Sequence, residues 1–77
     1  MLRVAININY LHICEIQAVR VKGEAELDSV GTYKISYLEK GVAKELGEVE
    51  HRYGDGAVKL AEIMTSYTSK KLDLKIG

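Results

Sequence analysis

The residues of this chain that could perform chemistry are few. His12 and Cys14 stand two positions apart, so on a strand their side chains would share a face, and His51 adds a second imidazole. Zinc sites usually take four protein ligands, or three and a water, in closely spaced pairs such as CxxC or HxxxH, and the chain has neither spacing. No neighbouring pattern marks an activated thiolate either. We therefore expect no metal, no cofactor and no catalytic thiol, and we interpret Cys14 as a buried apolar residue beside a histidine.

Carboxylates are the other candidates for catalysis. Glu24 and Glu26 lie two apart among lysines, and Glu45, Glu48 and Glu50 form the one acidic stretch of the chain. A general acid needs apolar surroundings that raise its pKa, and neither group has them in the sequence. Both groups are typical of a solvated surface, so the sequence favours a protein that is not an enzyme.

A glycine-flanked turn, RYGDG at residues 52–56, precedes a helical pattern. The backbone amides at the start of a helix are suited to hold an anion. The spacing matches neither a P-loop nor a dinucleotide fingerprint, and Asp55 would place negative charge where a phosphate should sit. We interpret Asp55 as the residue that caps the helix.

Tyrosines supply all the aromatic residues of the chain, and Tyr33 and Tyr37 flank Ile35 on one face of a predicted strand. Two alternatives remain for this face. It packs beneath a helix, or it is an exposed surface for a protein partner, since tyrosine is favoured at interfaces. Lys34 would point to the opposite side, so the face suits protein contact better than nucleic acid.

The net charge of the chain also disfavours nucleic-acid binding. Its 77 residues contain eleven Lys and Arg against eleven Asp and Glu, and the formal net charge is zero. Most nucleic-acid-binding proteins use a strong basic field for affinity. A weak nucleic-acid-binding regulator is therefore the alternative function, and its candidate contacts are Arg52, Lys70, Lys71 and Lys75.

The first 38 residues read as strands. Apolar residues alternate from Val4 to Tyr10, which predicts a strand with one buried face. The phase then changes between residues 11 and 18, which indicates either bulges or a strand covered on both faces. The run VRVKGEAEL at residues 19–27 alternates again and predicts a strand with Arg20 on its solvent side and a weak point at Gly23. Turn residues at 28–31 and the run TYKISYL after them predict a hairpin between residues 19 and 38.

Residues 39–53 fit two structures. Glu39-Lys40-Gly41 could be a hairpin turn that leads into a further strand, whereas Val42, Leu46, Val49 and Tyr53 follow a helical spacing. Two glycines, Gly41 and Gly47, would cost a helix about 2 kcal/mol relative to alanine. We favour the strand, with a bulge at Gly47.

The last element is a helix after Asp55. Its apolar residues recur at intervals of three and four, and Lys70 and Lys71 fall in its last turn, where cations suit the helix dipole. The tail at 72–77 alternates and is expected to add an edge strand or to remain loose. The order of elements predicts an α+β fold: a small antiparallel sheet of three to four strands with a C-terminal helix packed on one face.

We expect one domain over residues 1–77, because no linker or repeat divides the chain. It has no apolar stretch long enough for a membrane helix and no secretory pattern at residues 1–9, so we expect a cytoplasmic protein. A core without Phe, Trp or a disulfide is marginal at this size, which favours a homodimer. The sequence thus predicts a non-enzymatic protein-interaction module that associates with a protein partner or with itself, through a sheet face or a strand edge.

Overall fold

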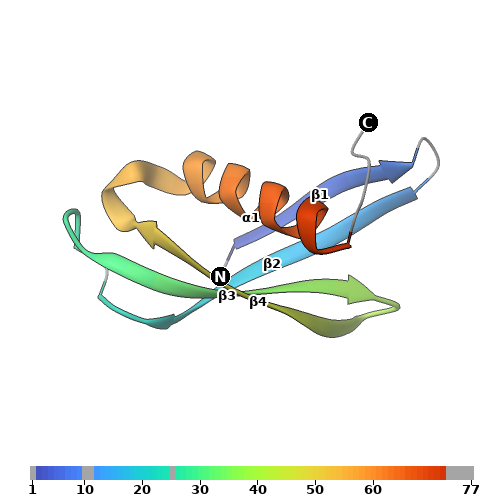
Figure 1. Cartoon of the computed structure of the whole chain (residues 1–77), viewed down its shortest axis with the longest axis horizontal. Helices are drawn as coiled ribbons and strands as arrows, with labels where there is room; N and C mark the ends of the chain where they lie inside the picture. The colour runs from blue at the N-terminus through green and yellow to red at the C-terminus, as the bar shows by residue number, and fades with distance from the viewer. Residues whose placement is uncertain (1, 10–11, 25, 73–77) are drawn as a thin grey trace.

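Four antiparallel strands follow one another across a single sheet, and one helix lies along one face of it (Figure 1). The computed structural model describes residues 2–9, 12–24 and 26–72, with the side chains of 6–9 and 12–14 left out. The elements are β1 (Leu2–Asn9), β2 (His12–Lys22), β3 (Val30–Glu39), β4 (Val42–Arg52), the short 3-10 helix η1 (Tyr53–Asp55) and α1 (Gly56–Leu72). The predicted α+β fold with a C-terminal helix is confirmed.

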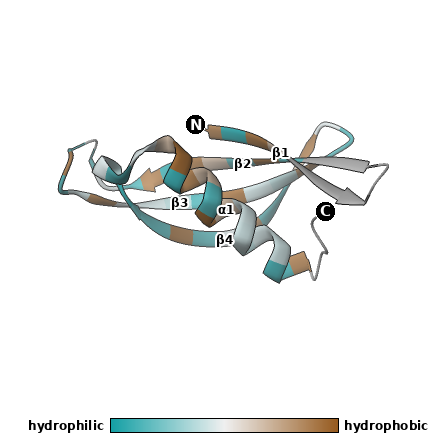
Figure 2. Ribbon diagram, turned by 90° about the horizontal axis from the view of Figure 1, so that it is seen from above, coloured by the Kyte–Doolittle hydropathy of each residue, from teal (hydrophilic) through white to brown (hydrophobic). Residues whose placement is uncertain are grey.

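The core forms between the apolar residues on one face of the strands and the apolar residues on the facing side of the helix. Ile16 and Ala18 of β2 stand opposite Tyr37 and Ile35 of β3, so these residues share one sheet face. Figure 2 shows polar and apolar residues alternating along the strands. The buried apolar residues of the described chain are Ile16, Ala18, Tyr33, Ile35, Leu60 and Met64. The helix therefore covers the same face from which the strands project their apolar residues.

Residues 42–52 form a strand, as favoured over the helix. Lys40 and Gly41 make a two-residue turn in which both residues have positive φ, and this geometry matches the twist of a hairpin. The register shifts where Ile35 pairs with Gly47 and Ser36 pairs with Glu45, which leaves Leu46 as the extra residue of a bulge. Gly47 has φ +146° and lies against the Tyr67 hydroxyl of α1. The predicted bulge at Gly47 is confirmed, and it also brings the helix close to β4.

The prediction of a strand at residues 19–27 is wrong in two respects: the length of the strand, and the sheet face on which Arg20 lies. β2 ends at Lys22, because Gly23 takes φ +95° and passes so close to β3 that a Cβ there would lie 2.9 Å from the Cα of Gly31. Arg20 pairs with the buried Tyr33 and belongs to the covered face, whereas Val21 is 47% exposed. The register of Ile16 and Ala18 runs on to Arg20, and the irregularity comes only after it.

The connection from β2 to β3 also differs in detail. The predicted turn at 28–31 is displaced, since the Ser29 amide donates to the Glu26 carbonyl at 3.0 Å and β3 already begins at Val30. A turn closed from residue 26 to residue 29 lets Val30 pair with Arg52 and Gly31 with His51. The hairpin of β2 and β3 itself is confirmed.

The predicted helix is confirmed, but its first turn differs from expectation. The Asp55 carboxylate accepts hydrogen bonds from Nε and Nη2 of Arg52 at 3.2 and 3.1 Å. No acidic residue lies in the first turn of α1, and Lys70 and Lys71 occupy its last turn as expected. Thr68 is fully buried, and its hydroxyl donates to the Met64 carbonyl at 2.7 Å, so this buried polar group is satisfied. The tail from residue 73 onward, with Lys75, lies outside the described residues.

Within the described residues, no helix lies on the second face of the sheet. Its ion pairs join neighbouring strands: Arg3 with Glu15 at 3.6 Å and Lys34 with Glu45 at 3.9 Å. Nowhere between residues 2 and 72, as far as they are described, does a helix reach the length and apolar content needed to cross a membrane.

Candidate binding pocket at the start of the helix

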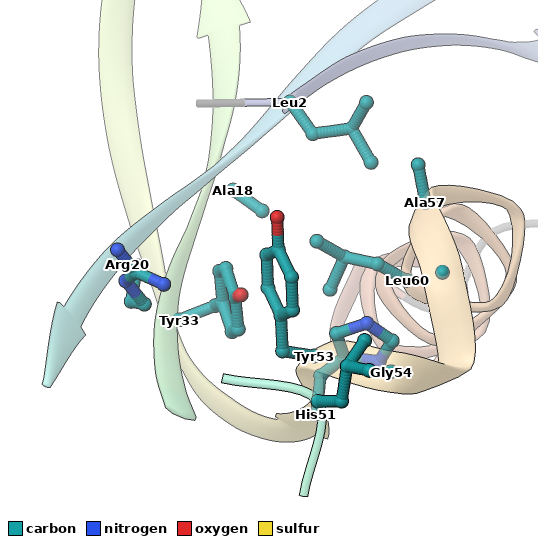
Figure 3. Close-up of a pocket in the computed structure, with 11 residues that line it drawn as sticks. Leu2, Ala18, Arg20, Tyr33, His51, Tyr53, Gly54, Ala57 and Leu60 are labelled. Carbon is teal, nitrogen blue, oxygen red and sulfur yellow. The ribbon is translucent and has the colours of Figure 1, made fainter. Parts of the chain in front are cut away.

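A pocket of about 660 Å³ opens between the sheet and the first turn of α1 (Figure 3). At 17 residues, α1 is about 25 Å long, whereas the molecule extends over 39 Å, so the helix cannot cover the whole sheet. The pocket lies at the end where its coverage begins. Its walls are Leu2, Ala18, Arg20, Leu27, Tyr33, His51, Tyr53, Gly54, Gly56, Ala57 and Leu60.

Backbone hydrogen bonds hold this end together. The Tyr53 amide donates to the Ser29 carbonyl and the Gly54 amide to the Leu27 carbonyl, both at 3.0 Å. These bonds tie the β2–β3 loop to η1. A Cβ at Gly54 would lie 2.5 Å from the Leu27 oxygen, so only glycine permits this approach. The loop and η1 therefore form one side of the pocket as a connected unit.

Aromatic and apolar side chains form the body of the pocket. Figure 3 shows Ala57 and Leu60 of α1 on one side and Tyr33 and Arg20 of the strands on the other, with the Tyr53 ring between them. Rings hold a wall apart because they have few rotamers and cannot collapse into a gap as an aliphatic chain does. Two tyrosine rings and two aliphatic side chains thus face the same space.

His51 is the unusual residue of this wall. Its side chain is only 4% exposed, its ring meets that of Tyr33 edge-on with centroids 5.7 Å apart, and its Nδ1 is buried without a hydrogen-bond partner. A buried polar atom without a partner costs about 1–3 kcal/mol. Nδ1 itself has almost no accessible surface, so this cost lies behind the pocket wall and not in the open space.

The pocket is electropositive. Arg20 is its one charged wall residue, and among the described residues no carboxylate forms an ion pair with it. The nearby Asp55 carboxylate is held by Arg52, and neither residue lines the pocket. The Gly56 amide, the first of α1, donates to the Tyr53 carbonyl, and the amides after it have no acceptor within the helix. The wall thus carries one positively charged side chain and no acidic one.

The structure places the predicted contact residues beneath the helix. Tyr33 is 8% exposed and Ile35 is fully buried, while Tyr37 is half-buried at the edge of the same cluster. The three do share one face. Of the two alternatives for this face, the helix covers it, and of the three residues only Tyr33 reaches the pocket.

The predicted basic residues do not form one surface. Arg52 is bound to Asp55 at one end of α1, whereas Lys70 and Lys71 lie in its last turn, roughly 20 Å along the axis. Lys75 is outside the described residues.

Sequence reasoning missed Arg20 and His51 as pocket residues. The sequence did contain a pattern that points to each of them. Arg20 follows the apolar Ile16 and Ala18 at two-residue spacing, and His51 follows Val49 at the same spacing. A polar side chain in an apolar register is a candidate for a site. The expectation for Cys14 and His12 concerns side chains that are not described.

Among the described side chains, no three His, Cys, Asp or Glu residues gather as metal ligands. Comparisons of the chain with models of protein families, with curated proteins and with solved structures find no match.

Proposed function

We propose that this chain is a non-enzymatic protein-interaction module whose binding site is the pocket at the start of α1 with the apolar residues around it. The observation that carries the proposal is the position of the exposed apolar side chains. In the described part of the chain, all the large ones except Val42 lie at this end. We call them the apolar rim: Val21, Leu27, Val30, Tyr53 and Val58. Leu27 and Tyr53 line the pocket itself, whereas Val30 lies on the opposite face of the sheet, because it alternates with the buried Gly31.

The rim is not a scatter of single residues. Leu27 is 71% exposed although its own carbonyl is fixed by Gly54, and Tyr53 is 45% exposed although its amide is fixed by Ser29. These side chains are therefore held out on an ordered backbone. Exposed apolar residues that lie at one end of a molecule, two of them in the wall of a pocket, are typical of a binding surface.

Affinity capture with matched variants tests the proposal. Leu27→Ser removes an exposed rim side chain, and Val42→Ser removes an apolar side chain that is 56% exposed at the opposite end of the sheet. A protein captured from the source organism by the wild type and by Val42→Ser, but not by Leu27→Ser, would support the proposal. Equal capture by both variants, or no specific capture by the wild type, would contradict it.

A second candidate is self-association through the outer edge of β1. β1 and β4 are the two edge strands. The sequence of β4 carries five charged residues and its strand has the bulge at Gly47, both of which protect an edge, whereas that of β1 carries only Arg3. An unprotected edge is the one that pairs with a second copy.

Sedimentation over a range of concentrations tests this candidate. Ala5→Lys adds a charge to β1, and Ala43→Lys adds the same charge to β4; both alanines are exposed. We expect a concentration-dependent dimer that Ala5→Lys weakens and Ala43→Lys does not. A monomer at every concentration, or equal effects of the two variants, would contradict pairing through β1.

A further inference from the structure

We propose that the outer edge of β4 receives an extended segment of a partner polypeptide in which apolar and basic residues alternate. The apolar side chains of this segment enter a groove between β4 and α1, and its basic side chains lie beside Glu48 and Glu50 on the other face of the sheet. This surface is separate from the pocket at the start of α1, so its partner is independent of the proposed function.

The edge of β4 is the first feature. Among the described strands, β4 pairs only with β3, and Figure 2 shows it as the outermost strand on the side opposite β1. After the bulge, the residues from Glu48 to Arg52 pair with β3 in one unbroken register. Alternate residues of this segment turn their amide and carbonyl groups away from β3. The backbone of an added strand would pair with these groups.

A groove beside this edge is the second feature. α1 follows β4 in the chain and runs back along it, so that the Tyr67 hydroxyl donates to the Leu46 carbonyl at 3.4 Å. A groove of about 420 Å³ lies between the two elements and shares no lining residue with the pocket at the start of α1. Because β4 is an edge strand, the groove opens toward the side on which a further strand would lie. The residues that line it include Val49, Lys59, Glu62, Ile63, Tyr67 and Lys70.

The groove selects apolar side chains. Successive residues of a strand point to opposite faces of a sheet, so every second residue of the added segment would lie on the α1 side. Val49 and Tyr67 are packed against the core on this side, and Ile63 adds aliphatic surface. Lys59 is paired with Glu62 at 3.8 Å, which leaves the groove without a free carboxylate. Apolar side chains are therefore favoured there, and basic ones are not.

The opposite face selects basic side chains. Glu48 and Glu50 flank Val49, so they project from the uncovered face of the sheet, and both are exposed. Neither forms an ion pair with a described residue, since Lys34, which stands opposite Glu48, is paired with Glu45 at 3.9 Å.

These charges also decide between a second copy and another partner. A second β4 at this edge would bring like charges together, which is destabilising, whereas lysine or arginine at alternate positions complements the two carboxylates. The charges that protect β4 from self-pairing thus favour a basic segment.

Amide resonances in two-dimensional NMR spectra provide the first test. The probe is a short acetylated and amidated peptide in which lysine alternates with valine. One control peptide has the same composition with its valines grouped together, and the other has glutamate in place of lysine. We expect saturable shifts from Glu48 to Arg52 and at Ile63 and Tyr67 with the probe, and affinity lower by about fivefold or more for both controls.

Each contrary result contradicts a particular part of the proposal. Equal affinity of the lysine and glutamate peptides would overturn the role of charge. Equal affinity of the alternating and grouped peptides would overturn the alternation. No binding of the probe, or shifts confined to the pocket at the start of α1, would overturn the site itself.

Methylation of the peptide backbone tests strand pairing. In a strand that lies beside β4, alternate amides donate to β4 and the others point away. One version of the probe is N-methylated at its lysines and another at its valines. We expect one version to lose binding and the other to retain it. Loss in both versions, or in neither, would show that the peptide does not bind as an added strand.

Variants of β4 locate the charge contact. The double variant Glu48→Gln and Glu50→Gln is expected to bind the lysine peptide about threefold or more weakly, with a smaller difference in high salt. Glu39→Gln is the matched control, because Glu39 is an exposed carboxylate at the far end of β3. Equal effects of the double variant and the control would overturn the contact.

Variants of α1 locate the groove contact. Ile63→Ala is expected to weaken binding by about fivefold or more, because it removes apolar surface from the groove. Ser66→Lys places a charge in the same groove at an exposed position and is expected to weaken binding without loss of a buried side chain. Val58→Ala is the control, since Val58 is exposed on α1 and does not line the groove. Affinities of Ile63→Ala and Ser66→Lys equal to that of the control would overturn the groove as the binding site.

Discussion

The layer between the helix and the sheet has two regions that differ in packing. In the middle, Ile16, Ile35 and Met64 are fully buried against one another. At the start of α1, the same sheet face presents Arg20 and His51 around a pocket. One face of one sheet is therefore closed over part of its length and open over the rest.

The two regions differ most clearly in whether their buried polar groups have hydrogen-bond partners. Thr68 in the closed region has its hydroxyl bonded to the Met64 carbonyl at 2.7 Å. His51 at the pocket keeps Nδ1 buried without a partner. A satisfied polar group is compatible with a stable core, whereas an unsatisfied one lowers stability. The closed region therefore adds to the stability of the fold, and the open region takes from it.

Ile35→Ala should give the largest effect and tests the closed region. Ile35 is fully buried beneath α1, so the loss of its side chain leaves a cavity and is expected to lower the free energy of unfolding by about 2–5 kcal/mol. Urea denaturation followed by circular dichroism measures the change. Val42→Ala, at an exposed site, is the control and should stay within about 0.5 kcal/mol. A loss below about 1 kcal/mol for Ile35→Ala would mean that the region is not tightly closed.

Gly47→Ala tests how the closed region is joined to β4. Gly47 has φ +146° and a Cβ there would meet the Tyr67 hydroxyl, which bonds to the Leu46 carbonyl at 3.4 Å. We expect a loss of about 1–3 kcal/mol in the same denaturation experiment. Gly41→Ala is the control, since its φ is +80° but nothing lies within 4 Å. Equal losses of stability in Gly47→Ala and Gly41→Ala would show that the contact with Tyr67 does not contribute to the loss at Gly47.

His51→Leu is expected to act in the opposite direction, and so to separate the two regions. It replaces the unpartnered imidazole by an apolar side chain of similar size, and stability should be unchanged or rise by up to about 1 kcal/mol. Thermal and urea unfolding measure this. A clear loss of stability would show that His51 contributes to the core as Ile35 does, and would remove the distinction drawn above.

The smallest effect is expected on the uncovered sheet face. Lys34 and Glu45 are 3.9 Å apart, with side chains 44% and 58% exposed. A double-mutant cycle with alanine at both positions should give a coupling of only about 0.2–1 kcal/mol, which decreases in high salt. A larger coupling, or one that salt leaves unchanged, would show that this face supports the fold more than its exposure implies.

Local patterns were sufficient to predict much of the fold. Two-residue alternation indicated β3, glycine at position 47 indicated the bulge, and the spacing of Leu60 and Met64 indicated α1. Each of these patterns depends on residues close in the chain. Even the ambiguous segment 42–52 was assigned correctly, because Gly41 and Gly47 disfavour a helix.

The candidate site could not be predicted in the same way. Its walls come from β1, β2, the β2–β3 loop, β4, η1 and α1, and no short pattern links these segments. The orientation of Arg20 was predicted wrongly, because alternation shows that two faces exist but not which of them a helix will cover. Asp55 was expected to cap the helix, yet its carboxylate binds Arg52.

Residue order alone was thus enough to specify the strands, the bulge and the helix, because backbone preferences and apolar periodicity act over a few residues. The place where the helix begins to cover the sheet, and with it the pocket that holds Arg20 and His51, depends on packing between segments as far apart in the sequence as Leu2 and Leu60. Such packing is set by side-chain volumes that meet only after the chain has folded.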